Sequence, residues 1–393
     1  MALSLLSHEV SDLCLGKPPL RCLSAVSATV SDAVAALKSS GEPFLSVWGC
    51  NHQHHEDDEE NDGSDCECVG KICMADVICH LSKDENTLLS PSAALKAPIS
   101  VLLPETRALV VHVQPSCRLL EAIDLIIRGA QNLIVPIQTK PITKRRQQKL
   151  QSQNAAVSIT TTVHKNGRQF CWITQEDIIR FLLGYIGLFS PLPAISIADL
   201  GIINSTYAIL AVDYNSSAAS AVPAISLALA DQTSVAVVNG AGDPTMALIG
   251  EISPLTLACC DESAAAAVAT LSAGDLMAYI DGGGPPESIL QAVKNRLEEK
   301  GLVGMLSLVE SLSACSPDEE SPARTYGKAV NSSAARRSEA IVCNPKSSLM
   351  AVMIQAIAHR VNYVWVMETD CSLVGIVTFV DMLKVFRDFL EHM

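Results

Sequence analysis

The stretch Gly375-Ile-Val-Thr-Phe-Val-Asp381 decides the fold, because its pattern indicates that a strand ends and a helix begins within it. Its apolar residues suit a buried strand, and Thr378 is a favourable residue at a helix start. Asp381 lies three residues further on, in the first helical turn, where its charge stabilises the helix dipole. The pattern recurs at Gly70-Lys-Ile-Cys-Met-Ala-Asp76, Cys171-Trp-Ile-Thr-Gln-Glu-Asp177 and Gly250-Glu-Ile-Ser-Pro-Leu-Thr256.

Each copy is followed by an amphipathic stretch, at 77–81, 178–185, 257–260 and 382–390, and is preceded by a further helix and strand. The preceding helices are expected to start at hydroxyl residues, near Thr29 or Ser31, Ser116, Ser216 or Ser217, and Ser347. Apolar strands follow at 44–48, 133–137, 234–238 and 364–367. The sequence therefore predicts an α/β (α+β) fold of four β-α-β-β-α units.

The repeat also predicts how the chain is divided. The first unit is expected at 1–90, with an acidic insertion at 51–68, and the second at 91–186, with a loop insertion at 138–168. The third unit is expected at 187–281. A linker at 282–340 starts with a helix near 286–300 and is then rich in Ser, Pro and charge, which predicts disorder. Residues 341–393 complete the fourth unit.

Composition narrows the class of protein. Hydrophobic residues make up 49% of the chain but aromatic residues only 4%, which suits thin aliphatic layers of helix on sheet. Eight of the 42 acidic residues lie between Glu56 and Glu67, and no basic face accompanies them, so we expect no nucleic-acid partner. The sequence contains no run of about 20 apolar residues, so we expect no membrane-spanning helix. The scattered cysteines and the lack of a basic leader indicate a cytoplasmic or nuclear protein.

The repeated unit, with its Gly-h-h-Thr-x-x-Asp ending (h is an apolar residue), resembles the CBS domain, named after cystathionine β-synthase. Four units resemble the γ subunits of AMP-activated and SNF1-type kinases, and above all the plant proteins made only of CBS domains (the CBSX type). The resemblance implies two Bateman modules, each a pair of units, and adenosine nucleotides bound between paired units. No Gly-x-Ser-x-Gly, phosphate loop or His-Glu-x-x-His motif is present, so we expect no enzyme activity.

In this family the hydroxyl residue lies at the helix start, where free N–H groups favour a phosphate. The aspartate lies one turn further on and can accept the ribose hydroxyls. Two copies retain both residues, which makes the ligand-binding candidates Thr174, Asp177, Thr378 and Asp381.

The other two copies depart from the pattern. The first keeps Asp76 but has Cys73 in place of the hydroxyl residue, and the third keeps Ser253 but has Thr256 in place of the aspartate. Asp76 and Ser253 are therefore weaker candidates. In all four copies a helix cap alone would also explain these residue types.

A second departure concerns phosphate charge. Kinase γ subunits carry basic residues just before the middle strand, whereas this chain has Glu42-Pro43, Gln131-Asn132, Gln232-Thr233 and Asn362-Tyr363 there. Basic residues near enough to substitute are Arg180, His359, Arg360 and Lys384. If none does, adenosine or the sulfonium S-adenosylmethionine fits better than a triphosphate. AMP, ADP and ATP are the other candidate ligands, and no permanent cofactor is expected.

These patterns favour a regulatory or adaptor protein that senses an adenosine-containing ligand. By resemblance, its partner would be an SNF1-related kinase complex or a redox protein, and the CBS units could also form a homodimer. One alternative is a scaffold whose nucleotide sites have degenerated. A more distant alternative is zinc binding at the first insertion, with the candidate ligands Cys50, just before it, and His52, His54, His55, Cys66 and Cys68 within it.

Overall fold

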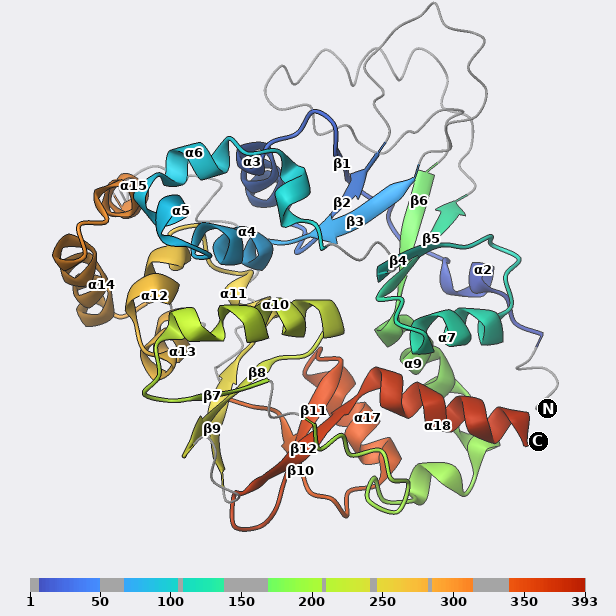
Figure 1. The fold of residues 1–393 in the computed structure, drawn as a ribbon. Helices are drawn as coiled ribbons and strands as arrows, with labels where there is room; N and C mark the ends of the chain where they lie inside the picture. The colour runs from blue at the N-terminus through green and yellow to red at the C-terminus, as the bar shows by residue number, and fades with distance from the viewer. Residues whose placement is uncertain are drawn as a thin grey trace, which may run out of the picture.

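The computed structural model describes residues 7–49, 67–104, 109–137, 169–206, 210–240, 246–281, 285–313 and 339–392. Within these ranges the chain forms four three-stranded sheets, each with its own helices (Figure 1). In every sheet the first strand is parallel to the second, and the second is antiparallel to the third. Four β-α-β-β-α units require this order, so the predicted fold class is confirmed.

The four units have these bounds. Unit 1 contains β1 (Cys22–Ser24), α3 (Val30–Ser40), β2 (Leu45–Trp48), β3 (Cys68–Ile72) and α4 (Met74–Leu81). Unit 2 contains β4 (Val110–His112), α7 (Leu119–Ile127), β5 (Asn132–Ile137), β6 (Gln169–Thr174) and α9 (Gln175–Gly184). Unit 3 contains β7 (Ala211–Asp213), η7 (Ala218–Ala221), α10 (Val222–Asp231), β8 (Val235–Asn239), β9 (Ala247–Ile252) and α11 (Pro254–Leu257). Unit 4 contains β10 (Val342–Cys343), α17 (Leu349–Ala358), β11 (Tyr363–Met367), β12 (Leu373–Thr378) and α18 (Phe379–Glu391).

Further helices join the units. They are α2 (Val10–Leu13), α5 (Glu85–Leu89), α6 (Pro91–Leu95), η1 (Ile99–Leu102), η4 (Ile186–Phe189), η5 (Leu192–Ala194), α12 (Ala264–Thr270), α13 (Ala273–Ile280), α14 (Glu287–Glu299) and α15 (Val303–Ser313). The helix predicted near 286–300 is present as α14, while α12, α13 and α15 were not predicted. Every residue of α12 is buried, so its alanine-rich sequence shows no amphipathic period.

Three predicted features lie outside the described residues. They are the acidic insertion with most of its candidate zinc ligands, the basic loop, and the Ser-rich part of the linker. In the parts of the chain that are described, no group of three or more His, Cys, Asp or Glu side chains could hold a metal ion. The same parts contain no helix that is both long and apolar enough to cross a membrane.

The segment before each unit lies against the helix start of another unit. The Val10 N–H donates to the Cys117 carbonyl at 2.8 Å, and the Val30 N–H donates to the Ala97 carbonyl at 3.0 Å. These bonds join units 1 and 2 reciprocally. Units 3 and 4 are joined in the same way by Leu349 N to Ile195 O and Ala218 N to Leu271 O.

These contacts explain a helix start that the sequence misplaces. Helix α7 begins at Leu119, after the N-cap Arg118, and not near Ser116. The Leu119 N–H donates to the His8 carbonyl at 3.0 Å. A free N–H group at the start of α7 is therefore satisfied by a distant backbone oxygen. From the sequence, a nearby hydroxyl was expected to accept such a hydrogen bond.

The sheets of each pair meet in different ways. Between units 1 and 2, Trp48 and Phe170 pack in an apolar cluster beside His112, whose Nε2 accepts a hydrogen bond from the Cys68 N–H at 3.0 Å. Between units 3 and 4 the carboxylate of Glu251, only 3% exposed, accepts hydrogen bonds from Ser234 Oγ at 2.9 Å, Tyr363 OH at 2.8 Å and Trp365 Nε1 at 2.9 Å. The second pair is thus held together by a buried polar network as well as by packing.

The two pairs then pack through helices. Helix α4 of unit 1 contacts α10, α11 and α12, and helices α7 and α9 of unit 2 contact α18 (Figure 1). Ion pairs cross the same boundary, from Arg387 Nε to Asp124 Oδ1 at 2.7 Å and from Lys38 Nζ to Glu262 Oε2 at 2.6 Å. Unit 1 therefore adjoins unit 3, and unit 2 adjoins unit 4, so that parts of all four units approach the centre.

The motif glycine of unit 4 allows a close backbone approach. A Cβ atom at Gly375 would lie 2.5 Å from the Asn204 carbonyl oxygen, and Asn204 exchanges two backbone hydrogen bonds with Ile376. We expect Gly375→Ala to displace this segment and to lower the free energy of unfolding by about 1–3 kcal/mol, measured by urea denaturation. Gly184→Ala is the control, because no atom lies within 4 Å of its added Cβ. Equal effects of the two variants would contradict the prediction.

Candidate functional site

A cavity of about 890 Å³ lies at the centre, where the four units meet. Its size falls within the range of small-molecule sites, roughly 300–1,000 Å³. Each unit contributes the residues just before its middle strand, which include Glu42, Gln131, Gln232 and Asn362. The positions at which the family resemblance implies phosphate-neutralising residues therefore do converge, but here they carry amides and one carboxylate.

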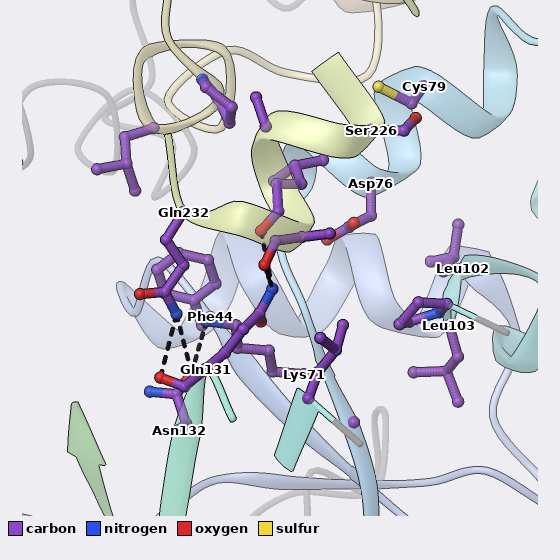
Figure 2. Close-up of a pocket in the computed structure, with 18 of the residues that line it drawn as sticks. Phe44, Lys71, Asp76, Cys79, Leu102, Leu103, Gln131, Asn132, Ser226 and Gln232 are labelled. Carbon is purple, nitrogen blue, oxygen red and sulfur yellow. Dashed lines mark hydrogen bonds between the residues drawn. The ribbon is translucent and has the colours of Figure 1, made fainter. Parts of the chain in front are cut away.

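Amide side chains cross the centre between the two pairs of units. Gln232 Nε2 donates to the Gln131 carbonyl at 3.3 Å and lies 3.4 Å from Asn132 Oδ1, while Asn362 Nδ2 donates to Gln232 Oε1 at 2.6 Å. Figure 2 shows Gln131, Asn132 and Gln232 linked in this way beside Lys71 and Asp76. The centre thus offers neutral donors and acceptors that belong to units 2, 3 and 4.

Lys71 brings a cation into the cavity from β3. Its Nζ donates to Asn132 Oδ1 at 2.6 Å and lies 4.9 Å from the centroid of the Phe44 ring. Burial lowers the pKa of Lys71 to about 8, although Cys73 and Asp76 oppose the shift. Sequence reasoning missed this residue. The only signal was a lysine inside an otherwise apolar strand ending, where a charge requires a partner.

Asp76 lies in the first turn of α4 and faces the same cavity. Its Oδ2 accepts a hydrogen bond from the Cys73 N–H at 2.7 Å. Burial raises the pKa of Asp76, while the Cys73 hydrogen bonds and the charge of Lys71 oppose that shift. The thiol of Cys73 stands where the other copies have a hydroxyl, yet the cap geometry of the motif is kept.

Two polar atoms of cavity residues have no hydrogen-bond partner among the described residues. They are Thr233 Oγ1, on a side chain that is almost fully buried, and His80 Nε2. Burial lowers the pKa of His80, which favours the neutral ring. Buried polar groups are nearly always paired, so unpaired groups that line a cavity indicate a site for water or a ligand.

The described residues that line the cavity carry no net formal charge. Its basic lining residues are Lys71, Lys83 and Arg360, and its acidic lining residues are Glu42, Asp76 and Glu176. Burial raises the pKa of Glu42, while the charge of Arg21, whose Nε lies 3.2 Å from Glu42 Oε1, opposes this shift. Such a balance suits a neutral or singly phosphorylated ligand better than a triphosphate.

The structure separates the residues predicted in unit 2. Thr174 lines the cavity, but Asp177 does not. Asp177 Oδ2 accepts hydrogen bonds from the Thr174 N–H at 2.7 Å, from Thr174 Oγ1 at 2.8 Å and from Lys17 Nζ at 2.7 Å. Arg180 pairs with Glu176 at 2.6 Å and lies outside the cavity lining. A ribose at Asp177 would have to displace Lys17.

In unit 4, Thr378 and Asp381 lie away from the central cavity. They form the same closed cap, with Thr378 Oγ1 donating to Asp381 Oδ2 at 2.7 Å, and Lys384 Nζ lies 3.3 Å from Asp381 Oδ1. Of the neighbouring basic residues, Arg360 lines the cavity and His359 does not.

In unit 3, Ser253 is buried at the start of α11, and its Oγ has no hydrogen-bond partner among the described residues. It lies outside the cavity lining, although the next residues, Pro254 and Leu255, belong to it. Of all the predicted site residues, the structure therefore brings together Asp76, Thr174 and Arg360 in one cavity.

The shifted pKa of Lys71 predicts a pH dependence of stability. Between about pH 8 and 10.5 the unfolded chain keeps the Lys71 proton that the folded chain has lost. Stability must therefore rise with pH through this window by the contribution of Lys71, since the unfolded state binds more protons. Urea denaturation at several pH values should show this rise as a difference between wild type and Lys71→Met. Identical pH profiles for the two proteins would contradict it.

Four paired β-α-β-β-α units around one central cavity define the CBS-domain architecture. No protein-family model matches the chain. The chain is 67% identical to the CBS domain-containing protein CBSX5 of Arabidopsis thaliana, with 100% of both chains covered. It is 20% identical to the SNF1-related protein kinase regulatory subunit gamma-like PV42b of the same plant, over 93% of this chain and 88% of that one.

The solved structure of protein MJ1225 from Methanocaldococcus jannaschii, a proposed archaeal homologue of γ-AMPK, is similar in fold. The TM-score is 0.53 at 13% identity, with 96% of this chain and 100% of that chain covered. The chain therefore belongs to the CBS domain-containing proteins of the CBSX type. It is a non-catalytic protein related to γ-type kinase subunits.

Proposed function

We propose that this CBS-domain protein is a regulatory subunit or adaptor that binds an adenosine-containing ligand in the central cavity. The observation that carries the proposal is the meeting of Asp76 with the loops before all four middle strands in one cavity. A ligand there would contact both pairs of units at once. Its binding would then change how the two pairs sit together, by as much as its affinity differs between the two arrangements.

The cavity lining supports a specific placement of the ligand. The Asp76 carboxylate would accept the ribose hydroxyls, while apolar residues such as Phe44, Leu102 and Leu103 would cover the base. A phosphate would turn toward Lys71 and Arg360. With equal numbers of acidic and basic lining residues, adenosine or AMP fits better than ATP.

The partner is proposed from the relatives. PV42b is named as a γ-like regulatory subunit of an SNF1-related kinase, so a kinase complex of this type is the first partner to test. A redox protein or a second copy of this chain is the alternative partner.

Thermal unfolding in the presence of adenosine, AMP, ADP, ATP or S-adenosylmethionine tests the ligand proposal. A ligand at 100 times its Kd adds about 2.7 kcal/mol to stability, which gives a clear rise in the unfolding midpoint. We expect adenosine or AMP to produce the largest rise and ATP a smaller one. If none of the five ligands shifts the midpoint, the sensor function is wrong.

A scaffold without a ligand is the second candidate function, and a different observation favours it. The caps at Asp177 and Asp381 are closed by Lys17 and Lys384. The contact between units 3 and 4 is filled by the Glu251 network. A scaffold of this kind would bind its protein partner equally well with and without the five ligands.

A further inference from the structure

The segment Ser7–Leu20, here called the N-terminal strap, precedes unit 1 but lies on unit 2. The Leu119 N–H donates to the His8 carbonyl at 3.0 Å, and the Leu20 N–H donates to the Phe170 carbonyl at 2.8 Å. Between these ends, Lys17 Nζ reaches Asp177 Oδ2 at 2.7 Å. The strap therefore covers the strand and helix that carry the unit 2 motif.

Beneath the strap, the motif glycine of unit 2 is replaced by Cys171, and the strap places Cys14 opposite it. The side chains of Cys14 and Cys171 lie near enough to shift each other's pKa, while Cys14 Sγ donates a hydrogen bond to the Val10 carbonyl at 3.3 Å. Cys14 is partly exposed, whereas Cys171 is fully buried.

The repeat supplies independent support for this juxtaposition. In unit 1 the covering segment is the chain before unit 2, and a Cβ at Gly70 would lie 2.8 Å from Leu103 Cδ2. Pro98, which forms an isolated β-bridge with Thr29 at the start of α3, lies five residues before Leu103. Glu9, which forms the equivalent bridge with Arg118 at the start of α7, lies five residues before Cys14. Cys14 in the strap and Cys171 in the unit 2 motif thus occupy the positions equivalent to Leu103 and Gly70 in unit 1, where the covering segment and the motif are in contact.

The surroundings give the two thiols unequal reactivity. The Cys171 side chain lowers the pKa of Cys14 and the charge of Lys17 acts in the same direction, while burial and the charge of Asp177 oppose the shift. The Cys14 side chain, together with burial, raises the pKa of Cys171. Because Cys14 is partly exposed and Cys171 is buried, Cys14 is the thiol that attacks and Cys171 the resolving thiol.

We propose that Cys14 and Cys171 form a reversible disulfide by exchange with a low-molecular-weight disulfide such as oxidised glutathione. The Cys14 thiolate attacks the glutathione disulfide, which forms a mixed disulfide and releases one glutathione thiolate. Cys171 then attacks the Cys14 sulfur, its proton passes to the leaving thiolate, and a second glutathione is released. Two protein thiols are oxidised while one glutathione disulfide is reduced to two thiols.

The bond would fasten the strap to β6 and hold Lys17 on Asp177. Oxidation would thereby keep the unit 2 motif closed, whereas the reduced protein could release the strap. This device does not depend on whether the central cavity binds a nucleoside, because neither cysteine lines that cavity.

The test incubates the full chain in glutathione buffers of increasing oxidised fraction, blocks free thiols by alkylation, and maps disulfides by mass spectrometry without reduction. We expect the Cys14–Cys171 cross-linked peptide to appear first, with a rise of a few degrees in the unfolding midpoint that dithiothreitol reverses. Cys14→Ser should abolish both changes. Cys371→Ser, at an exposed cysteine outside the strap, should change neither.

Two results would overturn the proposal. One is stable glutathionylation of Cys14 without the cross-link, and the other is a cross-link that forms only in urea. Both are read on the wild-type chain, so the test does not depend on the folding of a variant. Ligand binding by the oxidised and reduced proteins is measured separately, so failure of the cavity proposal leaves this result intact.

Discussion

Replacement of Glu251 by alanine is expected to lower the free energy of unfolding by about 3–5 kcal/mol, because it breaks a buried hydrogen-bonded network. Three donors would lose their acceptor, namely Ser234 Oγ, Tyr363 OH and Trp365 Nε1. All three side chains are buried, so water cannot replace the lost carboxylate without repacking. Urea denaturation followed by tryptophan fluorescence measures the effect.

The matched controls separate the network from the simple loss of a glutamate. Glu251→Gln retains one acceptor oxygen and the side-chain volume, so we expect a smaller loss of about 1–2 kcal/mol. Glu368→Ala removes an exposed glutamate of unit 4 and should change stability by less than about 0.5 kcal/mol. If Glu251→Ala costs no more than Glu368→Ala, the network does not hold units 3 and 4 together.

Asp76→Asn is expected to weaken binding of adenosine or AMP by about 100-fold, since hydrogen bonds to a charged acceptor contribute about 1.5–3 kcal/mol each. The substitution keeps the size of the side chain but removes the charge and half of its acceptor capacity for the ribose hydroxyls. Isothermal titration calorimetry measures the change in Kd.

Asp32→Asn is the matched control for Asp76→Asn. Asp32 caps α3 just as Asp76 caps α4, with Oδ2 accepting from the Thr29 N–H at 2.9 Å. It does not line the cavity. Both variants should lose about 1 kcal/mol of stability through the weaker cap, but only Asp76→Asn should lose ligand affinity. Equal affinities in the two variants would show that Asp76 acts only as a cap.

The fold could be predicted because its signals are local and repeated. Strand, cap and helix patterns occur within about ten residues at Gly375–Asp381 and at the three earlier copies. Two local signals failed because tertiary contacts override them. Helix α12 is buried all round, so it lacks an amphipathic period. The start of α7 is satisfied by the distant His8 carbonyl and not by a nearby hydroxyl.

The site was less predictable, because it depends on which segments cover each motif. Thr378 and Asp381 retain the full motif, yet their cap is closed and lies outside the cavity. Asp76, with an incomplete motif, faces the cavity. Nothing local to either motif distinguishes these cases.

Lys17 illustrates the same limit. It lies 160 residues from Asp177 in the sequence but donates a hydrogen bond to its carboxylate. The pairing of Cys14 with Cys171 depends on the same long-range placement of the strap.

Calorimetric titration of the full chain with AMP tests the central claim most directly, when it is carried out on wild type, Asp76→Asn, Asp177→Asn and Asp381→Asn side by side. The central cavity predicts a single site per chain that is lost in Asp76→Asn and kept in the other two variants. Binding that persists in Asp76→Asn but disappears in Asp177→Asn or Asp381→Asn would contradict the account, because the ligand would then lie in one of the capped motifs.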